Sequence, residues 1–282
     1  MLGNSEKTAG APVIANAAKL LRAAGKEICS DTATAAMANL DTDVLPDAAT
    51  LCRKVDLLLV FGGDGTMLRI AREIAGSRTP ILGINIGGLG FLTAVPSGEM
   101  AGALKRVWAG EYHFETRSLL QATGTSSGNK IDQAALNDIV ISRGISPRLI
   151  ELEVKVNGEA LTRYRCDGLI VNSPTGSTAY ALAAGGAVVF PTADAMGLTP
   201  ICPHTLSNRS LILPLSATVE ITVITETQAI ILSADGQVVS ELTAGDLIIV
   251  KRSRRAVVLM QLEGSSFCGT LRQKLHWRGA SL

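Results

Sequence analysis

The stretch that most clearly suggests chemistry is FGGDGTMLRI, residues 61–70, in which Asp64 stands among Gly62, Gly63 and Gly65. An apolar run precedes it, and the residues after it have helical spacing. Strand, glycine-rich turn and helix is the arrangement in which backbone N–H groups face a phosphate. Asp-Gly also suits a plain turn between two strands, because both residues tolerate positive φ. The stretch predicts a phosphate site that contains one acid, and a plain turn is the alternative.

A second polar stretch, DGLIVNSPTGSTAYALAAGG, covers residues 167–186. A strand leads into a loop of hydroxyl side chains and then into a helix of alanines, whose first turn suits a polar ligand, while Tyr180 offers a flat ring. Helix capping alone would also explain Ser177 and Thr178.

Two shorter motifs carry polar pairs. Asn137 and Asp138 precede a predicted strand and suit a ribose diol, although surface turns contain the same pair. The segment 235–237, Asp-Gly-Gln, predicts a turn.

Several common chemistries lack their motifs. The sequence contains no GxSxG, no GxxxxGK[ST], and no GxGxxG at Gly62, which argues against a serine hydrolase, a P-loop enzyme and a Rossmann dinucleotide fingerprint. Five scattered cysteines without CxxC spacing predict reduced structural thiols and no metal site.

Composition limits the partners. The net charge is +1 and charged residues make up 18% of the 282 residues, so the chain has no general attraction for nucleic acid or an anionic membrane. No apolar run approaches the roughly 20 residues of a membrane span, and the opening residues do not read as a signal peptide. We expect a cytoplasmic protein whose partners are small molecules or other proteins.

The first part of the chain predicts alternating helices and strands. A helix opens at Pro12, and strands are expected at 57–61 and 80–85, which together indicate a parallel sheet with covering helices. The polar residues 1–11 show no buried first strand. Either the chain starts late or the sheet is one strand short.

From about Arg117 the hydrophobic period changes to two. Residues 150–156 alternate strictly, an Asn157-Gly158 turn follows, and further strands are expected at 219–223, 229–232 and 247–250. We therefore predict an N-terminal Rossmann-like α/β domain (1–115) and a C-terminal β-sandwich domain (116–252). A tail (253–282), helical from Phe267, is expected to pack on the first domain.

Taken together, the motifs resemble the NAD kinase family in order and separation. They are GGDGT (62–66), NIGGLGFLT (85–93), LND (136–138), DGLIVNSPTGSTAYALAAGG (167–186), CPHTLS (202–207) and ADGQ (234–237). GGDGT alone also resembles lipid kinases and phosphofructokinases, whereas PTGSTAY followed by CPHTLS is specific.

The resemblance implies transfer of phosphate from ATP to the 2′-hydroxyl of the adenosine ribose of NAD, which gives NADP. It assigns Asp64 as general base or hydrogen-bond acceptor for that hydroxyl, with Gly62, Gly63, Gly65 and Thr66 around it. Mg²⁺ is expected to arrive with ATP, and the resembling enzymes are homodimers or homotetramers.

The resemblance also implies roles for residues along the NAD molecule. Asn137 and Asp138 would bind the nicotinamide-side ribose and Asp167 the nicotinamide end. Thr178, Ala179 and Tyr180 would line the adenine pocket. Further dinucleotide contacts would come from Arg69, Arg148, Arg165, Ala183 and Gln237.

The sequence departs from the family pattern at three places. Asp138 replaces a common glutamate, Ala181 and Ala183 replace two common serines, and the first strand is not evident. Two other functions stay open, a non-catalytic NAD sensor and a lipid kinase with the same GGDGT site. The sequence leaves open whether polyphosphate replaces ATP and whether NADH is accepted.

Overall fold

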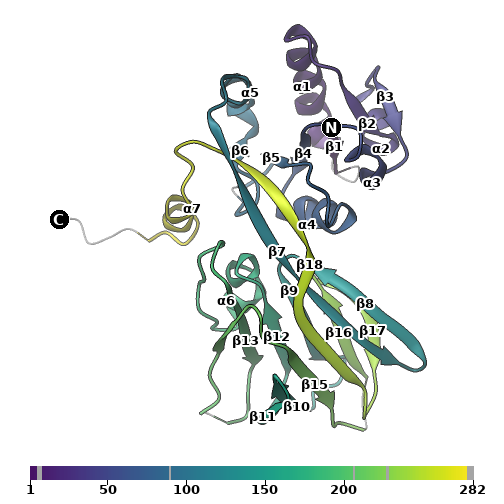
Figure 1. The fold of residues 1–282 in the computed structure, drawn as a ribbon, viewed down its shortest axis with the longest axis vertical. Helices are drawn as coiled ribbons and strands as arrows, with labels where there is room; N and C mark the ends of the chain where they lie inside the picture. The colour runs from purple at the N-terminus through teal and green to yellow at the C-terminus, as the bar shows by residue number, and fades with distance from the viewer. Residues whose placement is uncertain (5–7, 89, 206, 227–228, 278–282) are drawn as a thin grey trace, which may run out of the picture. The chain divides into compact units, whose positions relative to one another are not determined.

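The computed structural model describes residues 1–4, 8–88, 90–205, 207–226 and 229–277, and the chain divides into two compact units (Figure 1). Unit 1 comprises Met1–Thr116 and the chain from Val257, and unit 2 comprises Arg117–Ala256. Two long strands, β7 (Tyr112–Ser126) and β18 (Leu247–Leu262), contribute residues to both units.

Unit 1 is built on a parallel sheet in the order β1-β4-β5-β18, with β6 also beside β5. Its strands are β1 (Leu2–Gly3), β4 (Leu58–Gly62), β5 (Ile81–Asn85) and β6 (Val95–Pro96), and a separate parallel pair is formed by β2 (Cys29–Asp31) and β3 (Asp43–Leu45). Its helices are α1 (Ala11–Ala23), α2 (Thr32–Ala38), α3 (Ala48–Leu51), α4 (Asp64–Glu73), α5 (Met100–Ala109) and α7 (Phe267–Lys274), with 3₁₀ turns η1 (Thr8–Gly10) and η2 (Ser97–Glu99).

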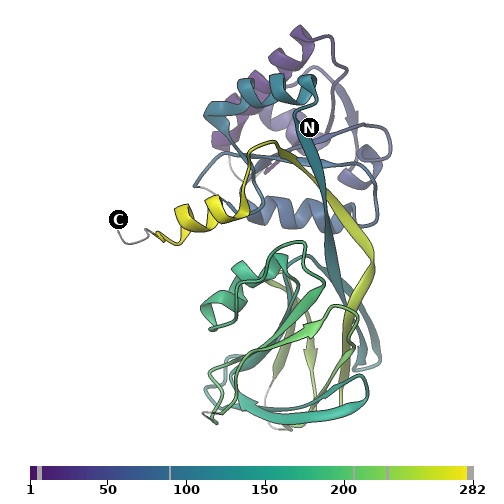
Figure 2. The ribbon, with the colours of Figure 1, turned by 60° about the vertical axis from the view of Figure 1, so that its left-hand side comes forward.

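Helices cover both faces of this sheet (Figure 2). Phe61 of β4 and Ile84 of β5 are fully buried in one cluster with apolar residues of α1 and α5. On the other face, a side chain added at Gly83 of β5 would come within 3.0 Å of the sulfur of Met67 in α4. A strand buried on both faces needs a continuous apolar run, which is why residues 57–61 read as a strand.

The polar opening of the chain does contain a strand, contrary to the expectation from sequence. Leu2 and Gly3 pair in parallel with Val60 and Phe61, and Leu2 is fully buried. Two residues are too few to show a period, so the pattern could not reveal this strand.

Unit 2 consists of two antiparallel sheets whose inner faces share one large apolar core. One sheet runs β18-β15-β10-β11 with β7 and β8 attached, and the other runs β14-β13-β12-β9-β16-β17. The strands are β8 (Asn129–Ala135), β9 (Asp138–Arg143), β10 (Ile150–Val156), β11 (Glu159–Cys166), β12 (Gly168–Asn172), β13 (Ala195–Ile201), β14 (Leu211–Pro214), β15 (Val219–Val223), β16 (Ile230–Ala234) and β17 (Gln237–Leu242).

Local turn chemistry joins these strands as predicted. Asn157 and Gly158 take positive φ between β10 and β11, and Asp235 and Gly236 do so between β16 and β17. The predicted alanine helix is shorter than expected, since a 3₁₀ turn, η3 (Thr175–Thr178), leads into a single helical turn, α6 (Tyr180–Ala183). The predicted fold class, an α/β domain with a β-sandwich domain, is confirmed.

Candidate functional site

Asp64 lies where two parallel strands end. β4 and β5 pair Gly62 with Asn85, so the loops that follow both strands emerge at the same edge of the sheet. Asp64 is the first residue of α4, after Gly63 at the N-cap. An acid in the first turn of a helix is stabilised by the unsatisfied N–H groups there, and the same N–H groups attract phosphate.

Both carboxylate oxygens of Asp64 accept backbone N–H bonds from the loop after β5. Phe91 donates to Oδ2 at 2.8 Å and Leu92 to Oδ1 at 3.0 Å. The approach is so close that a Cβ on Gly90 would lie 2.0 Å from Oδ1 of Asp64. The side chain is therefore fixed in direction, and each oxygen keeps a second lone pair for another donor.

The loop that holds Asp64 is itself organised by Asn85. The buried Asn85 amide donates to Thr93 Oγ1 at 2.8 Å and to the carbonyl of Gly88 at 2.7 Å, and its oxygen accepts from Gly87 N at 2.7 Å. Leu89, in the middle of the NIGGLGFLT motif, lies outside the described residues. The sequence pattern marks this motif but does not show that its backbone binds Asp64.

The other predicted residues of GGDGT shape the turn. A Cβ on Gly62 would lie 2.3 Å from Oγ1 of the buried Thr66. The Thr66 side chain therefore fits in its place only because residue 62 has no side chain. Arg69 forms an ion pair with Glu73 at 2.8 Å and donates to the carbonyl of Gly3 at 3.3 Å. Arg69 therefore ties α4 to the strand β1 that the sequence did not reveal.

In unit 2, Asp138 begins strand β9 and Asn137 directly precedes it, and this segment is held from two sides. On one side Ser173 N donates to the carbonyl of Asn137 at 2.8 Å, and a Cβ on Gly176 would lie 2.0 Å from that same oxygen. On the other side the carboxylate of Asp235 accepts from the backbone N–H groups of this segment. Three motifs that are distant in sequence thus meet at Asn137.

Asp138 is nearly inaccessible to solvent, at 4% exposure. Burial, and then the neighbouring charge of Asp235, raise the pKa of Asp138 from 3.8 to about 7. An acid that holds its proton near neutral pH both donates and accepts hydrogen bonds, which suits a diol.

The predicted adenine-side residues follow the same loop. Thr178 ends η3, and its hydroxyl donates to the carbonyl of Thr175 at 3.2 Å. Tyr180 begins α6 and is 48% exposed, and Ala183 is exposed at the end of α6. Ala179 lies between the two short helices. Gln237 is exposed directly after the Asp235-Gly236 turn.

Asp167 lies at the opposite end of the same pair of strands. β9 and β12 are antiparallel with Asp138 opposite Asn172, so the five residue steps from 167 to 172 separate Asp167 from Asp138 by roughly 17 Å along the strands. There Arg143 donates from Nε to Asp167 Oδ1 at 2.7 Å, a pairing that the sequence did not suggest. Arg165, nearby on β11, and Arg148 are exposed. Unit 2 therefore does not bring Asp167 together with Asn137 and Asp138.

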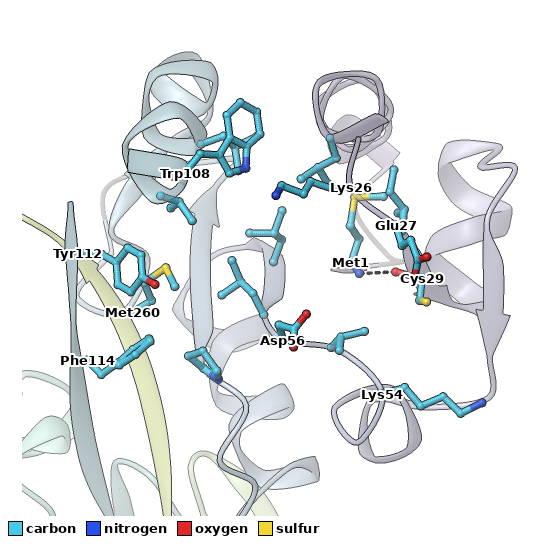
Figure 3. A pocket seen from close by; sticks show the side chains of 18 residues that line it. Met1, Lys26, Glu27, Cys29, Lys54, Asp56, Trp108, Tyr112, Phe114 and Met260 are labelled. Atoms are coloured by element: carbon cyan, nitrogen blue, oxygen red, sulfur yellow. Dashed lines mark hydrogen bonds between the residues drawn. The ribbon is translucent and has the colours of Figure 1, made fainter. Parts of the chain in front are cut away.

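A cavity of about 370 Å³ lies at the other edge of the unit 1 sheet (Figure 3). Residues that precede the strands line it, among them Asp56 and Pro80, together with Lys26, Trp108 and Tyr112. No predicted site residue is among those that line it. In open α/β sheets ligands bind at the carboxyl ends of the strands, which is the edge where Asp64 lies.

Among the described residues, no helix is long and apolar enough to cross a membrane, and no three His, Cys, Asp or Glu side chains lie together as a metal site. Leu206 of the CPHTLS motif lies outside this part of the chain. The backbone N–H of His204 in that motif donates to the carbonyl of Arg165 at 2.8 Å.

Comparison with known proteins settles which family has this pair of units. The ATP-NAD kinase N-terminal domain matches residues 15–112, and the ATP-NAD kinase C-terminal domain matches residues 136–262. The chain belongs to the ATP-NAD kinase family. A NAD kinase of Methylibium petroleiphilum is 39% identical over 98% of this chain and 93% of that protein. A NAD kinase of Symbiobacterium thermophilum is 47% identical over 79% of each chain.

Solved structures of this family share the fold. A yeast NADH kinase complexed with NADH has a TM-score of 0.87 at 27% identity, covering all of this chain and 88% of that one. A NAD kinase from Archaeoglobus fulgidus in complex with ATP has a TM-score of 0.75 at 26% identity, covering 94% and 95%. The resemblance to the NAD kinases that was inferred from the motifs is confirmed, and the chain is an enzyme of that class.

Proposed function

We propose that this protein transfers the γ-phosphate of ATP to the 2′-hydroxyl of the adenosine ribose of NAD and so forms NADP. The observation that carries the proposal is Asp64, a carboxylate at the start of α4 that two backbone N–H groups hold in place. Its relatives are named NAD kinases, and structural neighbours bind NADH or ATP.

Asp64 acts on the acceptor hydroxyl. A free lone pair of its carboxylate accepts the hydrogen bond of the 2′-hydroxyl and takes the proton as the bond to phosphorus forms. In a loose transition state little charge develops on the attacking oxygen, so the orientation of this hydroxyl contributes more than basicity.

The start of α4 would receive the phosphates of ATP. The N–H groups of Asp64 and Gly65 come before the first hydrogen bond of the helix, which Thr66 N donates to the carbonyl of Gly63 at 3.0 Å, and Gly63 and Gly65 leave open space around them. Mg²⁺ would be held mainly by the ATP oxygens, because this ion keeps several waters and binds through one or two carboxylates and substrate phosphates. The ion would neutralise part of the negative charge of the phosphates.

NAD would lie on unit 2. Asn137 and Asp138 would bind the nicotinamide-side ribose, and Thr178, Ala179 and Tyr180 would bind the adenine. Arg69, Arg148, Arg165, Ala183 and Gln237 are proposed as further contacts.

The position of Asp167 supports a homo-oligomer, a dimer or tetramer. A nicotinamide ring is bonded directly to its ribose, whereas Asp138 and Asp167 of one chain lie roughly 17 Å apart along the strands, so we infer that one nicotinamide riboside does not contact both residues of the same chain. A second copy would supply Asp167, with Arg143 orienting its carboxylate and Arg165 close by.

The test compares NADP formation by wild type and Asp64→Asn with NAD, ATP and Mg²⁺, alongside NAD binding by calorimetry. We expect turnover to fall by about 10²-fold or more while NAD binding survives. Replacing ATP by polyphosphate and NAD by NADH in the same assay determines the donor and the acceptor. A folded wild type that binds NAD without turnover would instead establish a sensor.

A further inference from the structure

Asp235 forms several hydrogen bonds to the segment that carries Asn137 and Asp138. The turn predicted at this position from the sequence does not imply them. Its carboxylate accepts from Leu136 N at 3.0 Å, from Asn137 N at 2.7 Å and from Asp138 N at 3.3 Å. In return, its own N–H donates to the carbonyl of Asp138 at 3.0 Å. A turn between β16 and β17 needs none of these bonds.

The backbone of Asp235 directs its side chain to this place. Asp235 and Gly236 both take positive φ, 48° and 75°, in the two-residue turn. Asparagine and aspartate tolerate that conformation better than other side chains. Strand β16 also pairs with β9, with Ala234 opposite Ile139, so the turn lies beside the start of β9.

The segment that Asp235 binds is also fixed from the other side. Ser173 binds the carbonyls of Leu136 and Asn137, through its hydroxyl and its N–H, and Gly176 leaves no room for a side chain against Asn137. The carbonyls of residues 136 and 137 thus face the PTGST loop, and the N–H groups of residues 136–138 face Asp235. Removing Ser173 would leave the carbonyls of residues 136 and 137 without these hydrogen bonds, and removing Asp235 would do the same to the N–H groups of residues 136–138.

We propose that Asp235 is a positioning residue for NAD: it orients Asn137 and Asp138 toward the ribose through their backbone. The inference rests on the proposed function, because it concerns the same NAD site. Asp235 acts through these neighbours and needs no contact with NAD itself. Sequence reasoning assigned this position only a turn.

The test is Asp235→Asn, which keeps the size and the tolerance for positive φ but replaces one carboxylate oxygen by a donor. That amide nitrogen would face a backbone N–H where a hydrogen-bond acceptor stood. We expect KM for NAD to rise about tenfold, which corresponds to about 1.4 kcal/mol, while KM for ATP changes less than about twofold. Amide hydrogen exchange of residues 136–138 should accelerate in the same variant.

Asp246→Asn is a matched control in the same unit. Asp246 also caps a turn with its carboxylate, accepting from Thr243 N at 2.8 Å and from Ser126 Oγ at 2.5 Å, but it contacts none of the site residues. If Asp235 had only a structural role, both variants would have a lower melting temperature, and their KM values for NAD would be equal. The proposal predicts that only Asp235→Asn raises it.

Two results would overturn the inference and leave the proposed function standing: an active Asp235→Asn with an unchanged KM for NAD, or equal rises in both KM values. A wild type that forms no NADP overturns the proposed function. In that case calorimetric titration with NAD still tests the role of Asp235. Weaker NAD binding by Asp235→Asn than by wild type supports that role, and equal binding contradicts it.

Discussion

The backbone N–H of Phe91 donates to Oδ2 of Asp64 at 2.8 Å, and the same residue's ring contacts the C-terminal helix. The Phe91 ring lies 6.3 Å from the ring of Phe267, centroid to centroid, and the ammonium of Lys274 stands 4.7 Å from its centre. Helix α7, about 200 residues further along the chain, therefore supports the proposed catalytic acid through a single intermediate residue.

Removing this support should lower turnover without removing substrate binding. Phe267→Ala deletes the ring contact, and aromatic pairs contribute about 0.5–1.5 kcal/mol, so we expect kcat to fall about 2- to 10-fold. Gln273→Ala, at an exposed position on the same helix, is the control and should behave as wild type. Equal kcat values in the two variants would show that α7 does not position the loop.

Gly90→Ala tests the geometry at Asp64 directly. The new Cβ would lie 2.0 Å from Oδ1, so the carboxylate or the loop must move. Misplacement of a catalytic group by an ångström costs on the order of 10²-fold in rate. Gly88→Ala in the same loop has open space around its Cβ and should retain most activity. Steady-state kinetics of the pair, with NAD binding measured separately, separates a steric effect from general damage to the loop.

Asp138→Asn should change how stability depends on pH. The native pKa of Asp138 is raised to about 7 from 3.8, so the folded state holds this proton more tightly than the unfolded state. The resulting stabilisation is complete below about pH 4 and is lost as pH rises to 7, by at most about 4 kcal/mol for a shift of about three units. Wild type should therefore lose more of its unfolding free energy than Asp138→Asn between pH 5 and pH 8.

Denaturant unfolding at the two pH values measures this difference. Glu159→Gln, which removes an exposed carboxylate from the same unit, should follow wild type. If Asp138→Asn follows wild type as well, Asp138 is ionised in the native protein at pH 5.

Sequence patterns predicted the elements that are formed by residues next to one another in the chain. The strand, turn and helix around Asp64 could be predicted because a buried strand, glycines and helical spacing follow one another directly. The Asn157-Gly158 hairpin has an equally local signal. Strand β1 was missed because Leu2 and Gly3 are too few to show a period.

The contacts within the site could not be read in this way. Asp235 binds Asn137 across 98 residues, and Arg143 binds Asp167 across 24. Such pairings arise from the order of strands in a sheet, which no single stretch encodes. Motif resemblance placed Asp138 and Asp167 at one ligand, and only the register of β9 with β12 showed that one chain holds them apart.

That separation predicts complementation between copies. In Asp64→Asn the proposed catalytic acid is lost, and in Asp167→Ala the nicotinamide contact is lost, so each variant alone should have little activity. If each site combines Asp64 of one copy with Asp167 of another, a mixed dimer contains one site with both residues intact. Co-expression of the two variants with different tags, followed by purification on both tags, should therefore restore about half of the wild-type activity per dimer. A site contained in one chain would leave every site in the mixed dimer defective, and no activity would return.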